Sequence, residues 1–301
     1  MKNVFHFTSV LLLLITSSCA YNNKFLKPAK YNENTKSITI QKTKIDSTIS
    51  VYNKPNYTPT FFKNGEDISS NQYTVEGVIF TNKNGNRLNG WMLKPKNIAI
   101  TITVIHLHGN SGSILSQHKP MLELLKKGYQ VFVFDYSGFG FSTGEATRKN
   151  LLIDGVAAVN YIKQRDDVKG TKLVLFGQSF GGHLASSVGA ICNKDLDAVV
   201  IEGGFSNHKD LAAQGAKPFV AFMSRIFVKE FYKGTKDIKK ITKPILIIHS
   251  TDDTVIPYYM GEKLFKNAKS EKELFTIKGI HLDGLYKYLN EIDLKIKGMV
   301  R

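Results

Sequence analysis

The sequence predicts an α/β protein built on a mostly parallel, doubly wound sheet. From residue 73 onward, short runs of β-branched and other apolar residues alternate with longer segments of helical periodicity. Most of these runs are continuously apolar, as expected for strands whose two faces are both covered by helices. Glycine-rich and polar loops follow several of them, at 106–112, 136–144 and 250–257. Because reactive groups gather beyond the carboxyl ends of strands in such sheets, these loops are where a site is expected.

Strand-like segments recur along the chain. The first two, 75–80 and 88–94, are separated by the turn-rich sequence 82–86 and predict a hairpin. The long β-branched run 98–107 predicts a central strand. The later strands are expected at 129–135, 173–176, 198–201, 244–249 and 273–277. A weak alternation of apolar residues over 37–51 indicates one more strand ahead of the hairpin.

Helical patterns occupy the segments between the strands. An amphipathic helix over 116–127 is expected to stop at Gly128, since glycine is favoured just past a helix C-terminus. A segment over about 206–240 interrupts the alternation and is predicted to be a small helical lid. Its large apolar residues either line an acyl-sized pocket or pack on the core. The apolar residues of the lid are Phe219, Phe222, Met223, Ile226, Phe227, Phe231 and Tyr232. The other helices are expected at 148–164, 182–190, 258–268 and 285–296.

The first residues have the features of a targeting segment, predicted over 1–18. A basic start precedes an apolar core at 10–15 and a short run of small residues. Cys19 directly after these residues resembles the bacterial lipobox, in which the cysteine becomes the lipidated first residue of the mature protein. Thr16 stands where such boxes more often have leucine. The alternative is an ordinary secretory signal cleaved near Ala20. Both interpretations predict export, and the first predicts a membrane-anchored lipoprotein of a bacterial cell envelope.

Residues 19–72 are rich in Asn, Lys, Ser and Thr and are predicted to be a lipidated N-terminus and a tether. The folded domain is then expected over 73–301. If Cys19 is lipidated, Cys192 is the other cysteine and an intrachain disulfide is excluded. Cys192 falls in a predicted helix and is interpreted as a small buried hydrophobic residue.

Composition limits the classes of partner. The 301 residues are 42% hydrophobic and 22% charged, which suits one domain with a substantial core. The net charge of +16 would suit an anionic membrane surface, but Lys is abundant throughout, so a solvated surface is the favoured interpretation. The chain has no arginine-rich helix, zinc-finger spacing or aromatic-basic platform, which argues against nucleic acid. Nothing in the sequence indicates an oligomeric state.

The strand at 173–176 leads into Gly-Gln-Ser-Phe-Gly, with Ser179 at its centre, and then into a helical run. This order of strand, sharp turn and helix is the context that a nucleophile elbow requires. Gly177 and Gly181 allow neighbouring backbone to pass close to the serine. The amide of Phe180 lies at the helix N-terminus, where developing negative charge is stabilised. A simple glycine-serine turn is the alternative interpretation of the same residues.

Acidic and imidazole side chains follow the later strands. Asp252 and Asp253 come after one of them, and His281 after the last. Glu202 follows an earlier strand and is a further candidate acid. Because the carboxyl ends of parallel strands meet at one edge of a sheet, Ser179, one acid and His281 are expected to lie together.

Other titratable residues near strand ends have structural interpretations. His106 and His108 lie at the end of a different strand from His281 and are interpreted as packing and hydrogen bonding within their loop. Asp135 heads the glycine-rich loop 136–144 and is expected to hold it through amide hydrogen bonds. That loop lacks the Gly-Lys-Ser/Thr sequence of a phosphate-binding loop. We therefore expect no cofactor or metal.

The chain from about residue 73 to its end resembles the α/β-hydrolase superfamily. It is most similar to the small serine hydrolases that include monoacylglycerol-lipase-like, depalmitoylase-like and serine-aminopeptidase-like members. The residues that carry the resemblance are 108–110, 134–140, 177–182, 253–257 and His281. The order Ser179, Asp253, His281 is also the order of this superfamily. The resemblance implies an α/β-hydrolase fold with a lid.

The resemblance also implies roles. Ser179 would be the nucleophile, His281 its general base and then general acid, and Asp253 the acid that orients the imidazole. The family pattern places the acid four residues before a proline, Pro257 here, and so selects Asp253 over Asp252.

The amides of Phe180 and Asn110 would form the oxyanion hole, Asn110 being carried over from the His-Gly-x position. Ser250 stands where many relatives have glycine, and Ser137 where many have arginine. Neither change removes a catalytic group.

These observations predict an exported serine hydrolase, anchored to a membrane, that cleaves acyl esters or thioesters through an acyl-enzyme. Its substrate is expected to be a small-molecule or lipid acyl compound. One alternative is a peptidase or amidase that uses the same three residues. Another is a non-catalytic surface lipoprotein that binds lipid or a partner.

Overall fold

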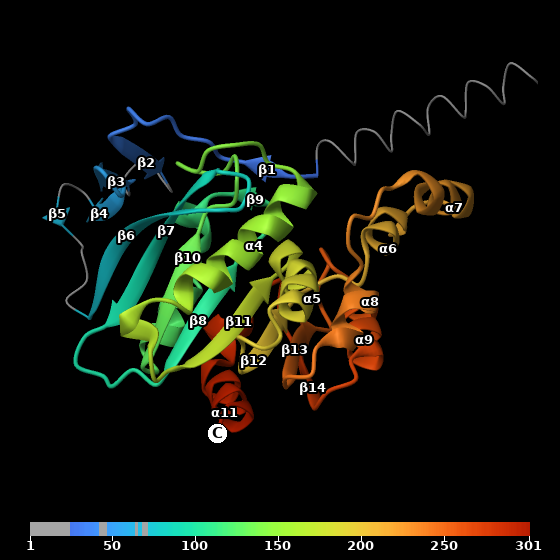
Figure 1. The fold of residues 1–301 in the computed structure, drawn as a ribbon. Helices are drawn as coiled ribbons and strands as arrows, with labels where there is room; N and C mark the ends of the chain where they lie inside the picture. The colour runs from blue at the N-terminus through green and yellow to red at the C-terminus, as the bar shows by residue number, and fades with distance from the viewer. Residues whose placement is uncertain (1–24, 42–46, 64–65, 68–71) are drawn as a thin grey trace, which may run out of the picture.

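The computed structural model describes residues 25–41, 47–63, 66–67 and 72–301 (Figure 1). Its main sheet has eight strands in the order β14-β13-β12-β11-β8-β10-β7-β6. Neighbours from β14 to β10 are parallel, whereas β7 and β6 are antiparallel to theirs. This confirms the predicted mostly parallel sheet. The strands are β6 (Tyr73–Thr81), β7 (Arg87–Pro95), β8 (Ile102–Leu107), β10 (Tyr129–Phe134), β11 (Lys172–Gln178), β12 (Ala198–Glu202), β13 (Ile245–Ser250) and β14 (Lys272–Ile277).

Helices cover both faces of the main sheet, so each central strand contributes to two apolar cores. In β11, Leu173 and Leu175 belong to one core, and Val174 and Phe176 to the other. This is why the central strands read as continuous apolar runs. The first core contains α4 (Arg148–Ile162), α5 (Phe180–Ile191) and α9 (Tyr258–Asn267), and the second contains α2 (Ile114–Gln117), α3 (Met121–Leu125), α10 (Gly284–Lys287) and α11 (Leu289–Met299).

Three predicted elements differ in their bounds. The expected helix over 116–127 is two short helices, α2 and α3, because Pro120 has no amide hydrogen with which to continue the first. The expected strand over 98–107 begins only at Ile102, since Asn97 adopts a left-handed φ of 60° that ends β7 in a turn. The last predicted helix is divided into α10 and α11 at Tyr288.

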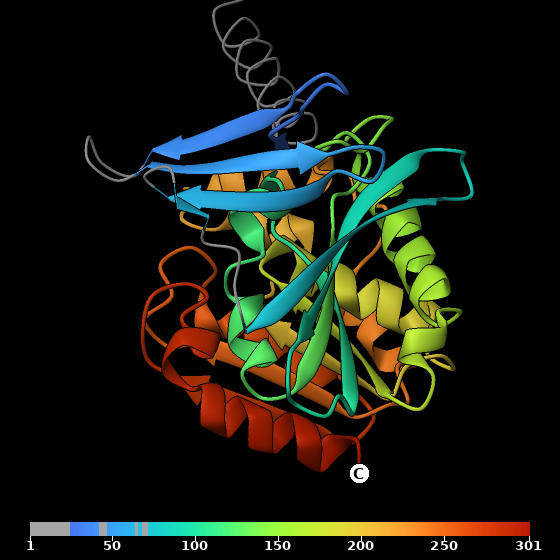
Figure 2. The same ribbon diagram turned by 90° about the vertical axis from the view of Figure 1, so that its left-hand side faces the viewer.

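The prediction of a tether over 19–72 is wrong for the described part of that range. A second, antiparallel sheet has the order β2-β3-β4-β5. The single strand expected over 37–51 falls on two of its strands, β2 and β3. Figure 2 shows it in blue as a separate layer, at the opposite end of the view from α11. The stretch contains β1 (Lys27–Pro28), β2 (Ser37–Gln41), β3 (Ser47–Asn53), β4 (Thr58–Lys63) and β5 (Glu66–Asp67).

Aromatic side chains of the second sheet attach it to the main domain. Phe61 stacks on His118, with ring centroids 5.6 Å apart, and meets Trp91 edge to face at 6.0 Å. Such contacts between distant segments bury Phe61 and hold the layer in place.

The predicted signal segment and Cys19 lie outside the described residues. Among the described residues, no helix has the length and apolar character needed to cross a bilayer.

The segment 206–240 is helical, as predicted, and its first two helices project from the body near the carboxyl ends of the strands (Figure 1). Its elements are α6 (His208–Ala213), α7 (Pro218–Phe227), α8 (Gly234–Asp237) and η2 (Ile238–Lys240). Phe219, Phe222 and Ile226 of α7 are 54%, 59% and 53% exposed. In this conformation these three side chains do not pack on the core, whereas Tyr232 of the same predicted set is buried in the first core.

Candidate active site

Ser179 lies in a strained turn between β11 and α5. Its backbone has φ 56° and ψ −118°, a conformation that side-chain-bearing residues rarely adopt. Two glycines make the turn possible. A Cβ atom at Gly177 would collide with the carbonyl oxygen of Gly181, and one at Gly181 with that of Leu107. The Ser179 amide donates to the carbonyl of Glu202 at 2.9 Å, which ties the turn to the end of β12.

The side chains of Ser179, His281 and Asp253 form one chain of hydrogen bonds at the carboxyl ends of β11, β14 and β13. His281 Nε2 is 2.9 Å from Ser179 Oγ, and His281 Nδ1 is 2.6 Å from Asp253 Oδ2. The other oxygen of Asp253 accepts hydrogen bonds from the amides of Val255 and Ile256, both at 2.8 Å. The structure thus brings together the three residues to which the sequence assigned catalytic roles.

The electrostatics of Asp253 suit this arrangement. Burial opposes its ionisation, but the hydrogen bond from His281 and the two backbone amides outweigh burial and hold its pKa below the usual range. An ionised Asp253 fixes Nδ1 of His281 as a donor and leaves Nε2 to accept the Ser179 proton. The geometry can therefore move a proton from the serine hydroxyl to the imidazole.

The two alternative acids occupy other positions. Asp252 is exposed, and His281 bonds its neighbour Asp253 instead. Glu202 is buried; Oε2 accepts from Gln178 at 2.7 Å and Oε1 from the amide of Gly284 at 2.8 Å. Glu202 therefore supports the loop that carries His281 instead of contacting the imidazole through a hydrogen bond. The sequence contained Glu202 as a candidate acid and gave no sign of this supporting role.

The two histidines at the end of β8 have the structural roles expected of them. Burial lowers the pKa of His106 to about 3, so the neutral ring bonds Gln178 Oε1 through Nε2 at 3.0 Å. His108 bonds the carbonyl of Gly109 through Nδ1 at 2.8 Å. Through Gln178, His106 also joins the hydrogen bonds that reach Glu202.

Phe180 and Asn110, the predicted oxyanion-hole residues, flank the serine from two elements. Phe180 is the first residue of α5, where a backbone amide has no partner within the helix. Asn110 lies in the loop between β8 and the two-residue strand β9 (Ser111–Gly112). This loop passes close to the serine, since a Cβ atom at Gly109 would be 3.9 Å from that of Ser179.

Comparison with known proteins identifies the family. The uncharacterized protein YfhR of Escherichia coli (strain K12) is 36% identical over 243 residues, which cover 77% of this chain and 83% of that protein. The family model described as alpha/beta hydrolase fold matches residues 102–231. The chain belongs to the α/β-hydrolase superfamily. The lysophosphatidylserine lipase ABHD12 of Danio rerio is 30% identical over 186 residues, which cover 57% of this hydrolase and 48% of that protein.

Solved structures share the fold of this hydrolase. The Pyrococcus furiosus esterase Pf2001 has a TM-score of 0.62 at 21% identity, over 76% of this chain and 92% of the esterase. Est1E of Butyrivibrio proteoclasticus, solved with ferulic acid bound, has a TM-score of 0.61 at 21% identity, over 74% and 99% of the two chains. The hydrolase therefore has the predicted α/β-hydrolase fold.

The two departures from the superfamily pattern both fill structural positions in this hydrolase. Ser250 Oγ donates to the carbonyl of Gly279 at 2.5 Å and accepts from the amide of Asp252 at 3.1 Å, so it links the loop of the acid to the loop of His281. Ser137 donates to buried Asp154 through both its amide and its hydroxyl. Across the described residues, no group of three or more His, Cys, Asp or Glu side chains is placed to hold a metal ion.

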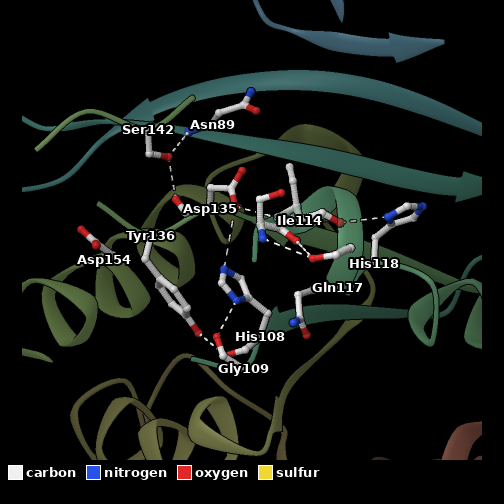
Figure 3. Close-up of polar contacts among 12 residues, drawn as sticks. Asn89, His108, Gly109, Ile114, Gln117, His118, Asp135, Tyr136, Ser142 and Asp154 are labelled. Carbon is white, nitrogen blue, oxygen red and sulfur yellow. Dashed lines mark hydrogen bonds and ion pairs between the residues drawn. The ribbon is translucent and has the colours of Figure 1, made fainter. Parts of the chain in front are cut away.

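The side chain of Asp135 bonds the start of α2, just after the Asn110 loop, and not its own glycine-rich loop as expected. Its Oδ1 accepts from the amide of Ile114 at 2.8 Å, while Tyr136 donates to the carbonyl of His108 at 3.1 Å (Figure 3). Burial raises the pKa of Asp135 to about 8 and lowers that of His108 to about 4. At neutral pH the two side chains, 3.9 Å apart, are therefore both uncharged and not an ion pair.

We expect the substitution Asp135→Asn to change how stability depends on pH. Between about pH 4 and pH 8 only the folded state keeps the Asp135 proton, so this group's contribution to stability falls as pH rises. Asparagine has no such titration and can still accept from Ile114. Relative to the parent, the variant should gain about 2 to 4 kcal/mol between pH 5 and pH 8. Urea unfolding of both proteins at the two pH values measures this gain, and parallel curves would contradict the raised pKa.

Proposed function

We propose that this chain is a serine hydrolase that cleaves carboxylic esters or thioesters through an acyl-enzyme. The observation that carries the proposal is the hydrogen-bonded chain Ser179–His281–Asp253, set on a strained turn at the start of a helix. A serine hydroxyl is a weak nucleophile unless a base takes its proton as it attacks. His281 is within hydrogen-bond distance of Ser179 Oγ and is oriented by a carboxylate, which is what that activation requires.

The proposed reaction has two halves. Ser179 Oγ attacks the carbonyl carbon while His281 takes its proton, and the resulting oxyanion is stabilised by the amides of Phe180 and Asn110. His281 then gives the proton to the departing alcohol or thiol, which leaves an ester on Ser179. In the second half, His281 takes a proton from water as the water attacks this ester. Collapse of the second tetrahedral species returns the proton to Ser179 and releases the carboxylic acid.

The names of the proteins to which the chain is similar support esters and thioesters, instead of amides, as the proposed substrates. ABHD12 of Danio rerio is named a lysophosphatidylserine lipase, and two solved structures of the same fold are esterases by name or carry a ferulic acid ligand. We propose that this hydrolase also acts on an acyl compound, as a small molecule or a lipid. An alcohol or thiol leaves more readily than an amine, so the same site acts on esters first.

We further propose that the hydrolase is exported and held at a bacterial membrane through lipidated Cys19. The apolar core at 10–15 and the small residues before Cys19 support this proposal. A single lipid chain gives only marginal binding, and a basic protein surface adds a second attraction to anionic lipid. The net charge of +16 has the sign that this attraction requires.

The proposal is tested with nitrophenyl esters from acetyl to palmitoyl and with a fluorophosphonate probe, using the full chain in detergent. We expect ester turnover and covalent labelling at Ser179, identified by peptide mass spectrometry. Labelling without turnover of any ester would replace the esterase with a peptidase or amidase. A folded chain that neither turns over esters nor reacts with the probe would refute the proposal and favour a binding lipoprotein.

A further inference from the structure

A short segment ahead of both sheets, residues 25–31, lies against the loop that carries Asn110. We call this segment the strap. Its two-residue strand β1 pairs in parallel with β9, which follows Asn110 directly (Figure 1). The amide of Lys27 donates to the carbonyl of Asn110, and the amide of Ala29 to that of Gly112, both at 2.8 Å. The strap thus adds a strand to the outer edge of the Asn110 loop.

The strap is also bonded to the glycine-rich loop on its other side. The amide of Gly140 donates to the carbonyl of Ala29 at 2.7 Å, and the amide of Tyr31 donates to the carbonyl of Gly140 at 2.8 Å. The hydroxyl groups of Tyr31 and Ser113 are 2.9 Å apart. The side chains of Asp135 and Tyr136 already link these two loops, and the strap adds backbone hydrogen bonds to both. It therefore further restricts the movement of the Asn110 loop relative to the rest of the domain.

Asn110 is held by the strap at two atoms. Besides the bond to its carbonyl, its side-chain Nδ2 donates to the carbonyl of Phe25 at 2.7 Å. Fixing both the carbonyl and the side chain of one residue leaves little freedom for its peptide planes. The strap, which is far away in sequence, thereby restrains the residue whose main-chain N–H an oxyanion would contact.

The ring of Phe25 reaches the second oxyanion-hole residue. It lies edge to face on Phe180 with centroids 5.6 Å apart, and on His208 at the start of α6 with centroids 5.1 Å apart. It also meets Phe205 at 6.2 Å. The strap therefore contacts the residues on both sides of the serine, Asn110 through hydrogen bonds and Phe180 through its aromatic ring.

We infer that the strap is a positioning element of the active site, which holds the Asn110 amide at the place where the oxyanion forms. This inference rests on the proposed function. A strand that only stabilised the fold would not need a hydrogen bond from the Asn110 side chain to the backbone of the strap. Oxyanion stabilisation depends on donors within a few tenths of an ångström of their places, so loosening the loop should lower kcat and leave substrate binding nearly unchanged.

The substitution Lys27→Pro tests this inference in the full chain. It removes the amide hydrogen that donates to the carbonyl of Asn110. We expect kcat for a short nitrophenyl ester to fall by about 10- to 100-fold, with KM within about twofold. Lys27→Ala is the matched control, because the Lys27 side chain is exposed and the backbone bond stays. Its kcat and KM should equal those of the parent.

A second variant and a folding measurement keep the outcomes separate. Asn110→Ala removes the side-chain donor to Phe25 but keeps the main-chain amide and adds no charge, and it should also lower kcat by about 10-fold or more. Circular dichroism and the melting temperature report whether each variant is folded. If Lys27→Pro does not fold, Asn110→Ala decides the question. Folded variants with the parent's kcat, or with a raised KM alone, would overturn the inference, whereas an inactive parent would refute the proposed function instead.

Discussion

Replacement of Ser179 by alanine is expected to lower ester turnover by about 10⁵-fold or more. The reason is that no other hydroxyl is hydrogen-bonded to His281 among the described residues, so the base loses its nucleophile. Residual hydrolysis by water would remain slow, because only binding and the oxyanion amides would still act. The measurement is the initial rate on a short nitrophenyl ester, with burst kinetics of the parent to count active sites. Fluorophosphonate labelling should disappear in the same variant.

A matched control lies on the helix that follows the serine. Ser186 is fully buried in α5, and its hydroxyl has no hydrogen-bond partner in the structure. Ser186→Ala therefore removes a serine from the same helix without touching the site, and its turnover should match that of the parent. Turnover by a folded Ser179→Ala protein at more than about a hundredth of the parent rate would contradict the proposed nucleophile.

The main sheet and the meeting of Ser179, Asp253 and His281 could be predicted because the signals are local and the topology is regular. Each central strand is buried on both faces, so each reads as an apolar run. Parallel order then places all carboxyl ends at one edge. Once the strands are located, the three side chains that follow β11, β13 and β14 have to converge there. Their contact is found in the structure, and their catalytic roles stay a proposal.

Apart from the strand expected over 37–51, the strands between residues 27 and 67 could not be predicted in this way. The partner of β1 lies far away along the chain, with Lys27 opposite Ser111, whereas β2 to β5 pair with their neighbours in sequence. Aromatic contacts such as that of Phe61 with His118 hold the second sheet in place. The local composition of Asn, Lys, Ser and Thr resembles that of a tether. Composition alone does not show which segments of the chain will pair or pack with this stretch. Composition gives a weak prior that tertiary contacts overrule.

Two further features of the structure could not be predicted from the sequence, because they also depend on contacts between distant residues. Periodicity shows that one face of α7 is apolar but not what covers that face, and in this structure Phe219 and Phe222 are exposed. A buried carboxylate after β12 reads as a candidate acid, but only the fold shows Glu202 bonded to Gly284. Side-chain partners set by three-dimensional position leave no trace in spacing along the chain.

The strap links the proposed anchor to the proposed chemistry. If Cys19 carries lipid, five residues lie between it and Phe25, and the six steps along the chain span at most about 20 Å. Phe25 contacts Phe180, so the serine would be held within a short distance of the bilayer. Acyl chains of membrane lipids would then be substrates that the enzyme reaches without releasing its anchor.

Three carboxylates compete for the role of the acid, and substitution of each by its amide should give three different results. We expect Asp253→Asn to lower kcat by about 10³- to 10⁴-fold, because an amide can no longer favour the His281 tautomer that accepts the serine proton. Glu202→Gln should cost about 10-fold, since its bond to Gly284 can remain while its bond to Gln178 is disturbed. Asp252→Asn should leave turnover unchanged, because that side chain is exposed and lies outside the bonded chain.

The order of these effects tests the geometry more strictly than any one of them. Asp253 is held by two backbone amides as well as by His281, so asparagine there must either present its amide nitrogen to the Nδ1 hydrogen or turn it toward Val255 and Ile256. Either choice sets one donor against another, and the imidazole loses its fixed orientation. The kcat values of the three variants on one ester give the ranking directly. A larger loss for Glu202→Gln than for Asp253→Asn would assign the acid to β12, and Glu202 would then have to move from Gly284 toward His281 in the working enzyme.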